Sequence, residues 1–221
     1  PSRDYDLLAG GTHNFSGEVQ ALKQPDNLRA EILARRDKLT DRERIEKSEQ
    51  ITVTLLSTDA VASSNSIFIY VNFRSEVETI VLIHRLIRMG KNVSVPLTRV
   101  AEKRLDIVMI EDPGRDLAPG YCNIPEPTEH AAAANTISPE SLDLIVLPGS
   151  VFDERGGSFG YGGGYYDRLL ARIPSAARYG LAFELQVVNK LNLQPHDEIL
   201  DAIVTEERLI TVPQRAARQP I

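Results

Sequence analysis

The sequence predicts one α/β domain whose central sheet is mostly parallel and flanked by helices. Short apolar segments, typical of buried strands, alternate with amphipathic segments, typical of helices, over most of the chain. Strands that alternate with helices imply right-handed crossovers, which set consecutive strands parallel. The 221 residues contain no internal repeat and no linker long enough to separate two domains. We therefore expect one domain over residues 26–221, preceded by an irregular N-terminal arm over residues 1–25.

The sequence after residue 25 predicts two helices, which together form a helical N-terminal cap. The first is expected to begin near Leu28, with Asp26 or Asn27 as its N-cap. Thr40 and Glu43 have the spacing of a capping box, which predicts the start of a second helix. The apolar residues expected on the buried side of that second helix are Ile45, Ile51 and Leu55.

The remaining elements follow from apolar runs and from the residues that interrupt them. Strands are expected at Ser66–Phe73, Asn92–Val95, Leu105–Glu111, Leu142–Leu147, Arg178–Phe183, Ala202–Thr205 and Leu209–Val212. Helices are expected at Glu76–Met89 and Tyr166–Arg172. Pro96 is expected to end the second strand, and residues 112–136, rich in Pro, Gly, Glu and Ala, predict a loop.

Composition and charge narrow the class of partner. Lys and Arg number 25 against 31 Asp and Glu, a net charge of −6, which argues against a dedicated nucleic-acid binder. No apolar run approaches the roughly 18 residues of a membrane span. Cys122 is the single cysteine, which excludes an intramolecular disulfide and suits a reducing compartment. We expect a cytoplasmic protein, a monomer or weak homodimer, whose partner is a small molecule rather than a nucleic acid or a membrane.

The most informative segment is the Gly-rich stretch between an apolar strand and a helix. Its glycines are Gly160, Gly162, Gly163 and Gly164, and it ends at Asp167. In an α/β sheet this junction lies at the carboxyl end of a strand, where ligands bind. Backbone N–H groups without neighbouring Cβ atoms can converge on a phosphate, and Asp167 can hold a hard cation. A turn-forming surface loop is the alternative interpretation, because neither a dinucleotide fingerprint nor a Walker motif is present.

Several motifs in register resemble the 5-formyltetrahydrofolate cyclo-ligase family, also called methenyltetrahydrofolate synthetases. The resemblance extends from about Leu28 to Glu206. It is carried by Leu28-Arg29 with Arg35 or Arg36 and Leu39, Glu76-Val77-Glu78-Thr79, Gly90-Lys91, Val95-Pro96, Ile124-Pro125-Glu126-Pro127, Leu147-Pro148-Gly149, Phe152-Asp153, Gly160 to Asp167, Phe183-Glu184-Leu185-Gln186, His196-Asp197 and Thr205-Glu206. It implies an open sandwich resembling the NagB/RpiA/CoA-transferase-like fold. It also implies an ATP- and Mg²⁺-dependent ligase that converts 5-formyltetrahydrofolate to 5,10-methenyltetrahydrofolate, releasing ADP and phosphate.

The resemblance also implies roles for individual residues. ATP would be bound by Arg29, Gly160, Tyr161, Gly162, Gly163, Gly164, Tyr165 and Tyr166. The reduced folate would be bound by Val71, Glu76 and Tyr165, with Glu76 on the N–H edge of the pterin. Mg²⁺ would be held by Asp167 and Asp197, directly or through water. No covalent nucleophile is assigned, and His196 is expected to be structural. Without the family, the favoured interpretation of Glu76 is a solvated surface acid or a helix cap.

Two departures from the family pattern leave alternatives open. Pro25 stands where the family has a Lys, and Lys23 is the nearest replacement. Ser158 stands where the family has an Arg in the Gly-rich loop, with Arg155 three positions earlier. An Arg that stabilises transferring phosphoryl charge has a large effect on rate. A paralogue acting on another N-formyl or amine compound, or a folate- or nucleotide-binding protein without turnover, therefore remains an alternative.

Overall fold

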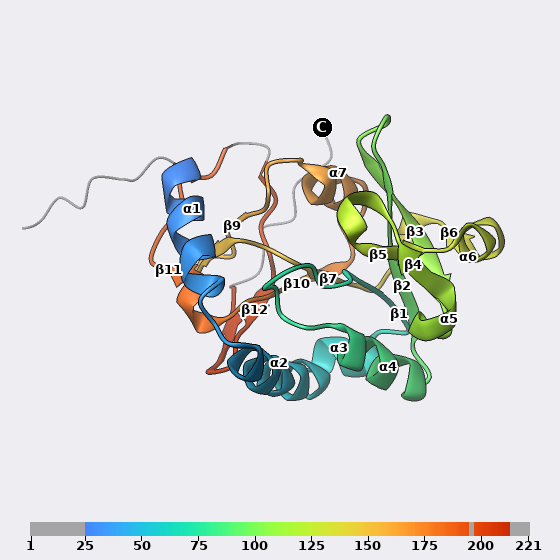
Figure 1. Ribbon diagram of the computed structural model, residues 1–221, viewed down its shortest axis with the longest axis horizontal. Helices are drawn as coiled ribbons and strands as arrows, with labels where there is room; N and C mark the ends of the chain where they lie inside the picture. The colour runs from blue at the N-terminus through green and yellow to red at the C-terminus, as the bar shows by residue number, and fades with distance from the viewer. Residues whose placement is uncertain (1–24, 195–196, 213–221) are drawn as a thin grey trace, which may run out of the picture.

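The computed structural model describes residues 25–194 and 197–212, and one sheet of eight strands organises them (Figure 1). From one edge to the other the strands are β13 (Leu209–Thr211), β12 (Ala202–Val204), β10 (Ala177–Leu181), β7 (Leu144–Leu147), β1 (Ser66–Ile69), β2 (Asn92–Arg99), β3 (Arg104–Ile110) and β6 (Thr136–Ile137). The five central strands, β12 to β2, pair in parallel, whereas β13, β3 and β6 pair antiparallel at the edges. The prediction of an α/β fold with a mostly parallel sheet is confirmed.

Helices cover both faces of this sheet. They are α1 (Pro25–Arg36), α2 (Asp41–Leu56), α3 (Asp59–Ser63), α4 (Ile80–Arg88), α5 (Pro113–Asp116), α6 (Glu129–Asn135) and α7 (Tyr165–Arg172), with 3₁₀ turns η1 (Tyr121–Asn123), η2 (Pro139–Ser141) and η3 (Glu184–Gln186). Figure 1 shows α2, α3 and α4 on one side of the sheet and α7 on the other. Strand β1 contributes side chains to a hydrophobic core on each face of the sheet. Ile67 and Ile69 pack in the core on the side of α2 to α4, whereas Phe68 packs in the core on the side of α7. None of the helices in the described residues is long and apolar enough to cross a membrane.

Two small sheets complete the fold. One includes the strands just before the Gly-rich loop, and the other lies within residues 112–136, where a loop was predicted. One consists of β11 (Val187–Val188), β8 (Val151–Asp153) and β9 (Ser158–Phe159), and the other of β4 (Leu117–Pro119) and β5 (Pro125–Pro127). The loop prediction for residues 112–136 is therefore wrong, since the segment contains α5, β4, η1, β5 and α6. Its prolines are accommodated because β4 and β5 pair only with each other, where missing N–H donors are tolerated.

The two N-terminal helices match the prediction in part. Helix α1 begins at Pro25 rather than near Leu28, since proline is well suited to the first helical position. The Thr40–Glu43 capping box of α2 is confirmed, with both reciprocal hydrogen bonds present. Ile51 and Leu55 are buried, but Ile45 is 55% exposed, so its assignment to the buried side is wrong. Of the arm predicted over residues 1–25, residues 1–24 lie outside the described residues, and Pro25 is the first residue of α1.

Two further boundaries differ, and both differences bear on the site. Strand β2 runs through Pro96 to Arg99, because β1 pairs with it only as far as Ser94 and the proline lies beyond that ladder. Helix α4 begins at Ile80 rather than at Glu76. Residues 70–79 therefore leave β1 as an irregular segment, and Glu76 belongs to that segment instead of to a helix start.

Candidate functional site

Two cavities adjoin each other where β1 and β7 end. We call the first, of about 430 Å³, the tyrosine cavity, because Tyr70, Tyr121, Tyr161, Tyr165 and Tyr166 line it. We call the second, of about 280 Å³, the loop cavity, because it is lined by every residue from Ser158 to Asp167. The residues common to both cavities are Pro148, Tyr161, Gly163, Tyr165 and Tyr166. The Gly-rich loop is thus the wall between two neighbouring binding spaces at the edge where α/β sheets bind ligands.

The backbone of the Gly-rich loop is open toward the loop cavity. Gly162 and Gly164 have positive φ angles of 88° and 62°, a region that favours glycine. A Cβ atom added at Gly160 or Gly162 would meet nothing within 4 Å, so these positions face free space. Gly164 is also the N-cap of α7, so the first turn of that helix points its free N–H groups toward the same end of the loop. This geometry suits an anion such as a phosphate group.

Arg29 is the only Lys or Arg among the described residues that line the loop cavity. Its Nε donates to the Gly160 carbonyl at 2.8 Å, and its Nη1 donates to Asp26 Oδ1 at 2.5 Å. The guanidinium carbon also lies 5.7 Å from the centre of the Phe159 ring. Helix α1 therefore supplies a guanidinium to the loop from a position about 130 residues earlier in the chain.

Asp167 and Asp197 both line the loop cavity, although they come from different segments of the chain. Asp167 lies in the first turn of α7, and Asp197 Oδ2 accepts the backbone N–H of Gln194 at 2.7 Å. The described part of the chain holds no group of three or more His, Cys, Asp and Glu side chains suited to a metal. Two carboxylates beside a loop whose backbone suits phosphate nevertheless match the way Mg²⁺ is usually bound, through one or two carboxylates plus phosphate oxygens and water.

Glu76 is the buried acid of the tyrosine cavity. It is 5% exposed and its Oε2 accepts the backbone N–H of Phe73 at 2.8 Å. Burial raises the pKa of this carboxyl, while the Phe73 N–H, the charge of Arg36 and a hydrogen bond with Tyr161 lower it in part. This burial contradicts the interpretation of Glu76 as a solvated acid or helix cap. Val71, also buried, and Tyr165 line the same cavity, so the three residues predicted to bind one ligand share one space.

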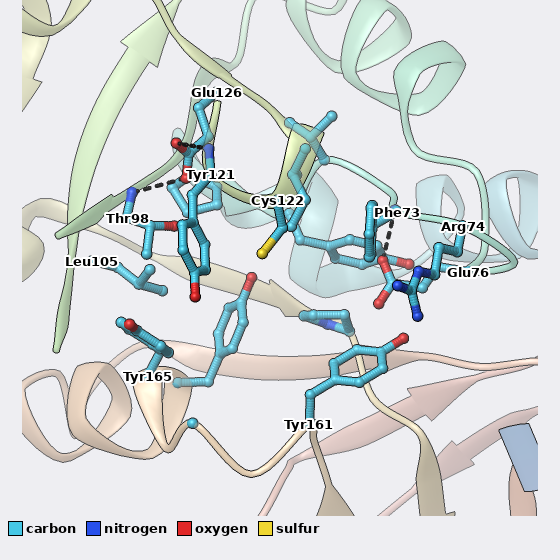
Figure 2. Close-up of a pocket in the computed structure, with 17 residues that line it drawn as sticks. Phe73, Arg74, Glu76, Thr98, Leu105, Tyr121, Cys122, Glu126, Tyr161 and Tyr165 are labelled. Atoms are coloured by element: carbon cyan, nitrogen blue, oxygen red, sulfur yellow. Dashed lines mark hydrogen bonds between the residues drawn. The ribbon is translucent and has the colours of Figure 1, made fainter. Parts of the chain in front are cut away.

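Tyr161 points from the Gly-rich loop toward Glu76 (Figure 2). Its hydroxyl accepts a hydrogen bond of 2.8 Å from Nη2 of Arg36. Burial, followed by the nearby charge of Glu76, raises the pKa of Tyr161 to about 12, so the phenol keeps its proton at neutral pH. No local sequence signal distinguishes Tyr161 from the other loop residues, because its partners come from α1 and from the segment after β1.

Glu126 is a second buried acid of the tyrosine cavity. It was not predicted as a site residue and appeared only within the Ile124–Pro127 motif. Its carboxylate accepts the N–H of Thr98 and the N–H of Tyr121, each at 3.0 Å, as the dashed lines of Figure 2 show. These bonds hold Tyr121 and Cys122 over the tyrosine cavity. The available signal was the Ile124-Pro125-Glu126-Pro127 motif, which the family resemblance includes.

The departures noted in the sequence have different outcomes. Ser158 lines the loop cavity, where its short side chain carries no charge. Arg155 is held elsewhere, because its Nη2 donates to Asp153 Oδ2 at 2.6 Å and to the Leu191 carbonyl at 3.0 Å, and it lines neither cavity. Arg155 therefore does not take the place of an Arg at position 158. Lys23 and His196 lie outside the described residues.

Comparison with known proteins agrees with this geometry. The model of the 5-formyltetrahydrofolate cyclo-ligase family matches residues 21–206. The mouse 5-formyltetrahydrofolate cyclo-ligase is 30% identical over 187 residues, which cover 81% of this chain and 92% of the mouse protein. The enzyme of the same name from Escherichia coli K12 is 28% identical over 180 residues, 80% of this chain and 98% of that protein.

Solved structures give the same result for the fold. The 5,10-methenyltetrahydrofolate synthetase of Aquifex aeolicus superimposes with a TM-score of 0.75 and 28% identity, over 88% of this chain and 96% of that chain. The synthetase of Mycoplasma pneumoniae superimposes with a TM-score of 0.65 over 82% of this chain and 98% of that chain. At 21% identity, the second match supports the fold alone.

Proposed function

The chain belongs to the 5-formyltetrahydrofolate cyclo-ligase family, and on that premise we propose that it uses ATP to convert 5-formyltetrahydrofolate to 5,10-methenyltetrahydrofolate. One observation carries this proposal beyond the family match. The tyrosine cavity, with its buried Glu76, and the loop cavity, with its open glycine backbone, are divided only by the Gly-rich loop. Ligands bound in the two cavities can therefore contact each other beside the residues that line both cavities.

The tyrosine cavity is the proposed folate site. The buried carboxylate of Glu76 suits the N–H edge of a pterin, because a charged acceptor paired with two donors is much stronger than a neutral one. Val71 and Tyr165 supply the apolar and aromatic surface that a flat ring system needs. Because Tyr165 also lines the loop cavity, a formyl group beside it lies close to a phosphate held by the loop.

The loop cavity is the proposed ATP phosphate site. Gly160, Tyr161, Gly162, Gly163, Gly164, Tyr165 and Tyr166 would surround the phosphates, and Arg29 would add a charged donor from α1. Asp167 and Asp197 are the proposed holders of Mg²⁺. When bound, Mg²⁺ supplies charge neutralisation for the phosphate oxygens.

The chemistry needs positioning and charge stabilisation rather than a covalent protein nucleophile. The formyl oxygen attacks the γ-phosphorus, so that an O–P bond forms while the bond to ADP breaks. N10 then attacks the activated formyl carbon and gives up its proton, and the C–O bond breaks as phosphate leaves. The role of this chain is to hold the formyl oxygen in line with the γ-phosphate and to keep water from the activated carbon.

We also propose the finer features of the fold that the sequence predicts. Five parallel strands with antiparallel edges support an open sandwich of the NagB/RpiA/CoA-transferase-like kind, spanning residues 26–221 as one domain. Helix α1 supports the role of an N-terminal cap, since it packs against β8 and η3 and delivers Arg29 to the loop.

The test is a turnover assay with 5-formyltetrahydrofolate, Mg²⁺ and ATP, in which the methenyl product is followed by its near-ultraviolet absorbance. We expect turnover by the native chain and none by Asp167→Ala. Folate binding without ATP consumption in the native chain would indicate a binding protein instead. Failure to bind folate would indicate a paralogue for another N-formyl or amine compound.

A further inference from the structure

Arg36 is a buried cation that lies behind both cavities and lines neither of them. It is 2% exposed, at the end of α1. Its Nε donates to Ser75 Oγ at 3.0 Å, its Nη2 to Tyr161 Oη at 2.8 Å, and its Nη1 to the Gly149 carbonyl at 3.4 Å. One guanidinium thus joins the segment that carries Glu76, the Gly-rich loop and the turn after β7.

Each partner of Arg36 is, or is next in the chain to, a residue that lines one or both cavities. Ser75 precedes Glu76 in the chain, and its hydroxyl also donates to Asp37, so the Glu76 segment is fixed to the end of α1. Gly149 follows Pro148, which lines both cavities. Tyr161 also lines both; its hydroxyl accepts a hydrogen bond from Arg36, and its side chain points toward Glu76 (Figure 2). Tyr161 is therefore placed between the acid of one site and the loop of the other.

The loop depends on Tyr161 because its neighbours make few contacts. The Gly160 carbonyl is held by Arg29 and Ser150, and the Gly163 carbonyl by Arg168. Between these two anchors, Gly162 has a positive φ and no atom within 4 Å of its Cβ position. The Tyr161 side chain thus ties the middle of the loop to the body of the protein.

We propose that Tyr161, held by Arg36, is a positioning residue that couples the two cavities. The inference rests on the proposed function. A ligand that pairs with Glu76 fixes the carboxylate, which fixes the Tyr161 hydroxyl and so orders the loop for phosphate. The second ligand then orders less of the protein when it binds and loses less conformational entropy. The two ligands therefore bind with positive cooperativity. By linkage the effect is reciprocal, so the nucleotide tightens folate binding by the same factor.

Calorimetric titration measures this coupling directly. The dissociation constant of 5-formyltetrahydrofolate is determined with and without a saturating non-hydrolysable ATP analogue and Mg²⁺. The dissociation constant of the analogue is then determined with and without saturating 5-formyltetrahydrofolate. In the native chain we expect each ligand to tighten the other about fivefold or more, the typical size of such couplings. In Tyr161→Phe, which keeps the ring and loses the hydroxyl, we expect the coupling to fall to about onefold to twofold.

Two further variants test whether the coupling depends on the contact between Tyr161 and Arg36. Tyr179→Phe removes the hydroxyl of a tyrosine on β10 that lines neither cavity, and its coupling factor should stay at the native value. Arg36→Lys keeps the buried charge but loses the fork that spans Ser75 and Tyr161, so its coupling should fall as in Tyr161→Phe. Native coupling of onefold, or full coupling in Tyr161→Phe, would overturn the inference while leaving the folate site intact. Absence of folate binding by the native chain would overturn the inference and the proposed function together.

Discussion

Arg178 and Glu198 form a buried ion pair, with Nη1 of the arginine 2.6 Å from Oε2 of the glutamate. Their side chains are 2% and 8% exposed. Arg178 Nη2 also donates to the Leu170 carbonyl near the end of α7, at 2.7 Å. Glu198 follows Asp197, and α7 carries Asp167 in its first turn. The pair therefore joins the two segments that bring both proposed metal carboxylates to the loop cavity.

We predict that Arg178→Met lowers the free energy of unfolding by about 3–5 kcal/mol, because it leaves the Glu198 charge buried without its cation. Urea denaturation measures the loss. The matched control is Arg85→Met, which breaks the more exposed pair of Arg85 and Glu49 and should cost about 1 kcal/mol or less. Equal losses in the two variants would contradict the prediction.

Glu76→Gln should stabilise the protein at neutral pH while it removes folate binding. Burial raises the pKa of Glu76 above its ordinary 4.5, so the folded state favours the protonated carboxyl. That contribution is fully present below pH 4.5 and is lost as the pH rises through the raised pKa. Gln cannot ionise, so it does not carry this penalty. The Tm advantage of Glu76→Gln over the native chain should therefore grow from about zero below pH 4.5 to a maximum at neutral pH. A Tm difference that moves the opposite way with pH would contradict this.

Asp153→Asn should weaken the base of the Gly-rich segment. Asp153 is fully buried, and its carboxylate accepts the N–H groups of Gly157 at 2.9 Å and Leu191 at 2.8 Å. Burial alone would raise the pKa of this carboxyl, but these N–H groups and the Arg155 guanidinium lower it overall. The stability it provides is present above its unfolded pKa and is lost as the pH falls through the lowered folded pKa.

We expect Asp153→Asn to lose about 2–3 kcal/mol of unfolding free energy at pH 7, the worth of hydrogen bonds to a charged group. Thermal and urea unfolding at pH 7 and pH 3 measure the effect, which should shrink at the lower pH. Glu154→Gln is the control, because the adjacent Glu154 is half exposed and forms a surface ion pair with the exposed Arg208. A loss in Glu154→Gln as large as that in Asp153→Asn would contradict the assignment.

The sequence predicted the parallel core well because its signals are local. The buried run Leu144–Leu147 and the capping box at Thr40 and Glu43 each need only their neighbours to specify an element. The misjudged positions depend on partners far away in the chain. Pro96 continues a strand because β1 ends beside it, and Ile45 is exposed because no helix or strand of the described residues covers it. The role of Arg36 could not be read from the sequence for the same reason, since its three partners come from residues 75, 149 and 161.

Arg29→Ala should impair ATP binding more than any other single charge removal on α1. Arg29 is the only Lys or Arg among the described lining residues of the loop cavity, and Ser158 adds no charge there. Losing a charged hydrogen bond to phosphate corresponds to about a tenfold to hundredfold rise in KM for ATP. Arg35→Ala is the matched control, because Arg35 lies on the same helix, is exposed and lines neither cavity, so its KM should stay at the native value.

Ser158→Arg tests the same cavity from the opposite direction. A guanidinium at position 158 would enter a space that already holds Arg29, and it would face the phosphoryl group as negative charge develops during transfer. We therefore expect kcat to rise in Ser158→Arg with the KM for folate unchanged, because the tyrosine cavity does not include Ser158. Ser158→Gln, which has length and hydrogen-bonding groups but no charge, should leave kcat close to the native value. Steady-state kinetics at varied ATP and varied folate separate the two parameters, and a fall of kcat in Ser158→Arg would mean that Arg29 alone already satisfies the charge requirement of the loop cavity.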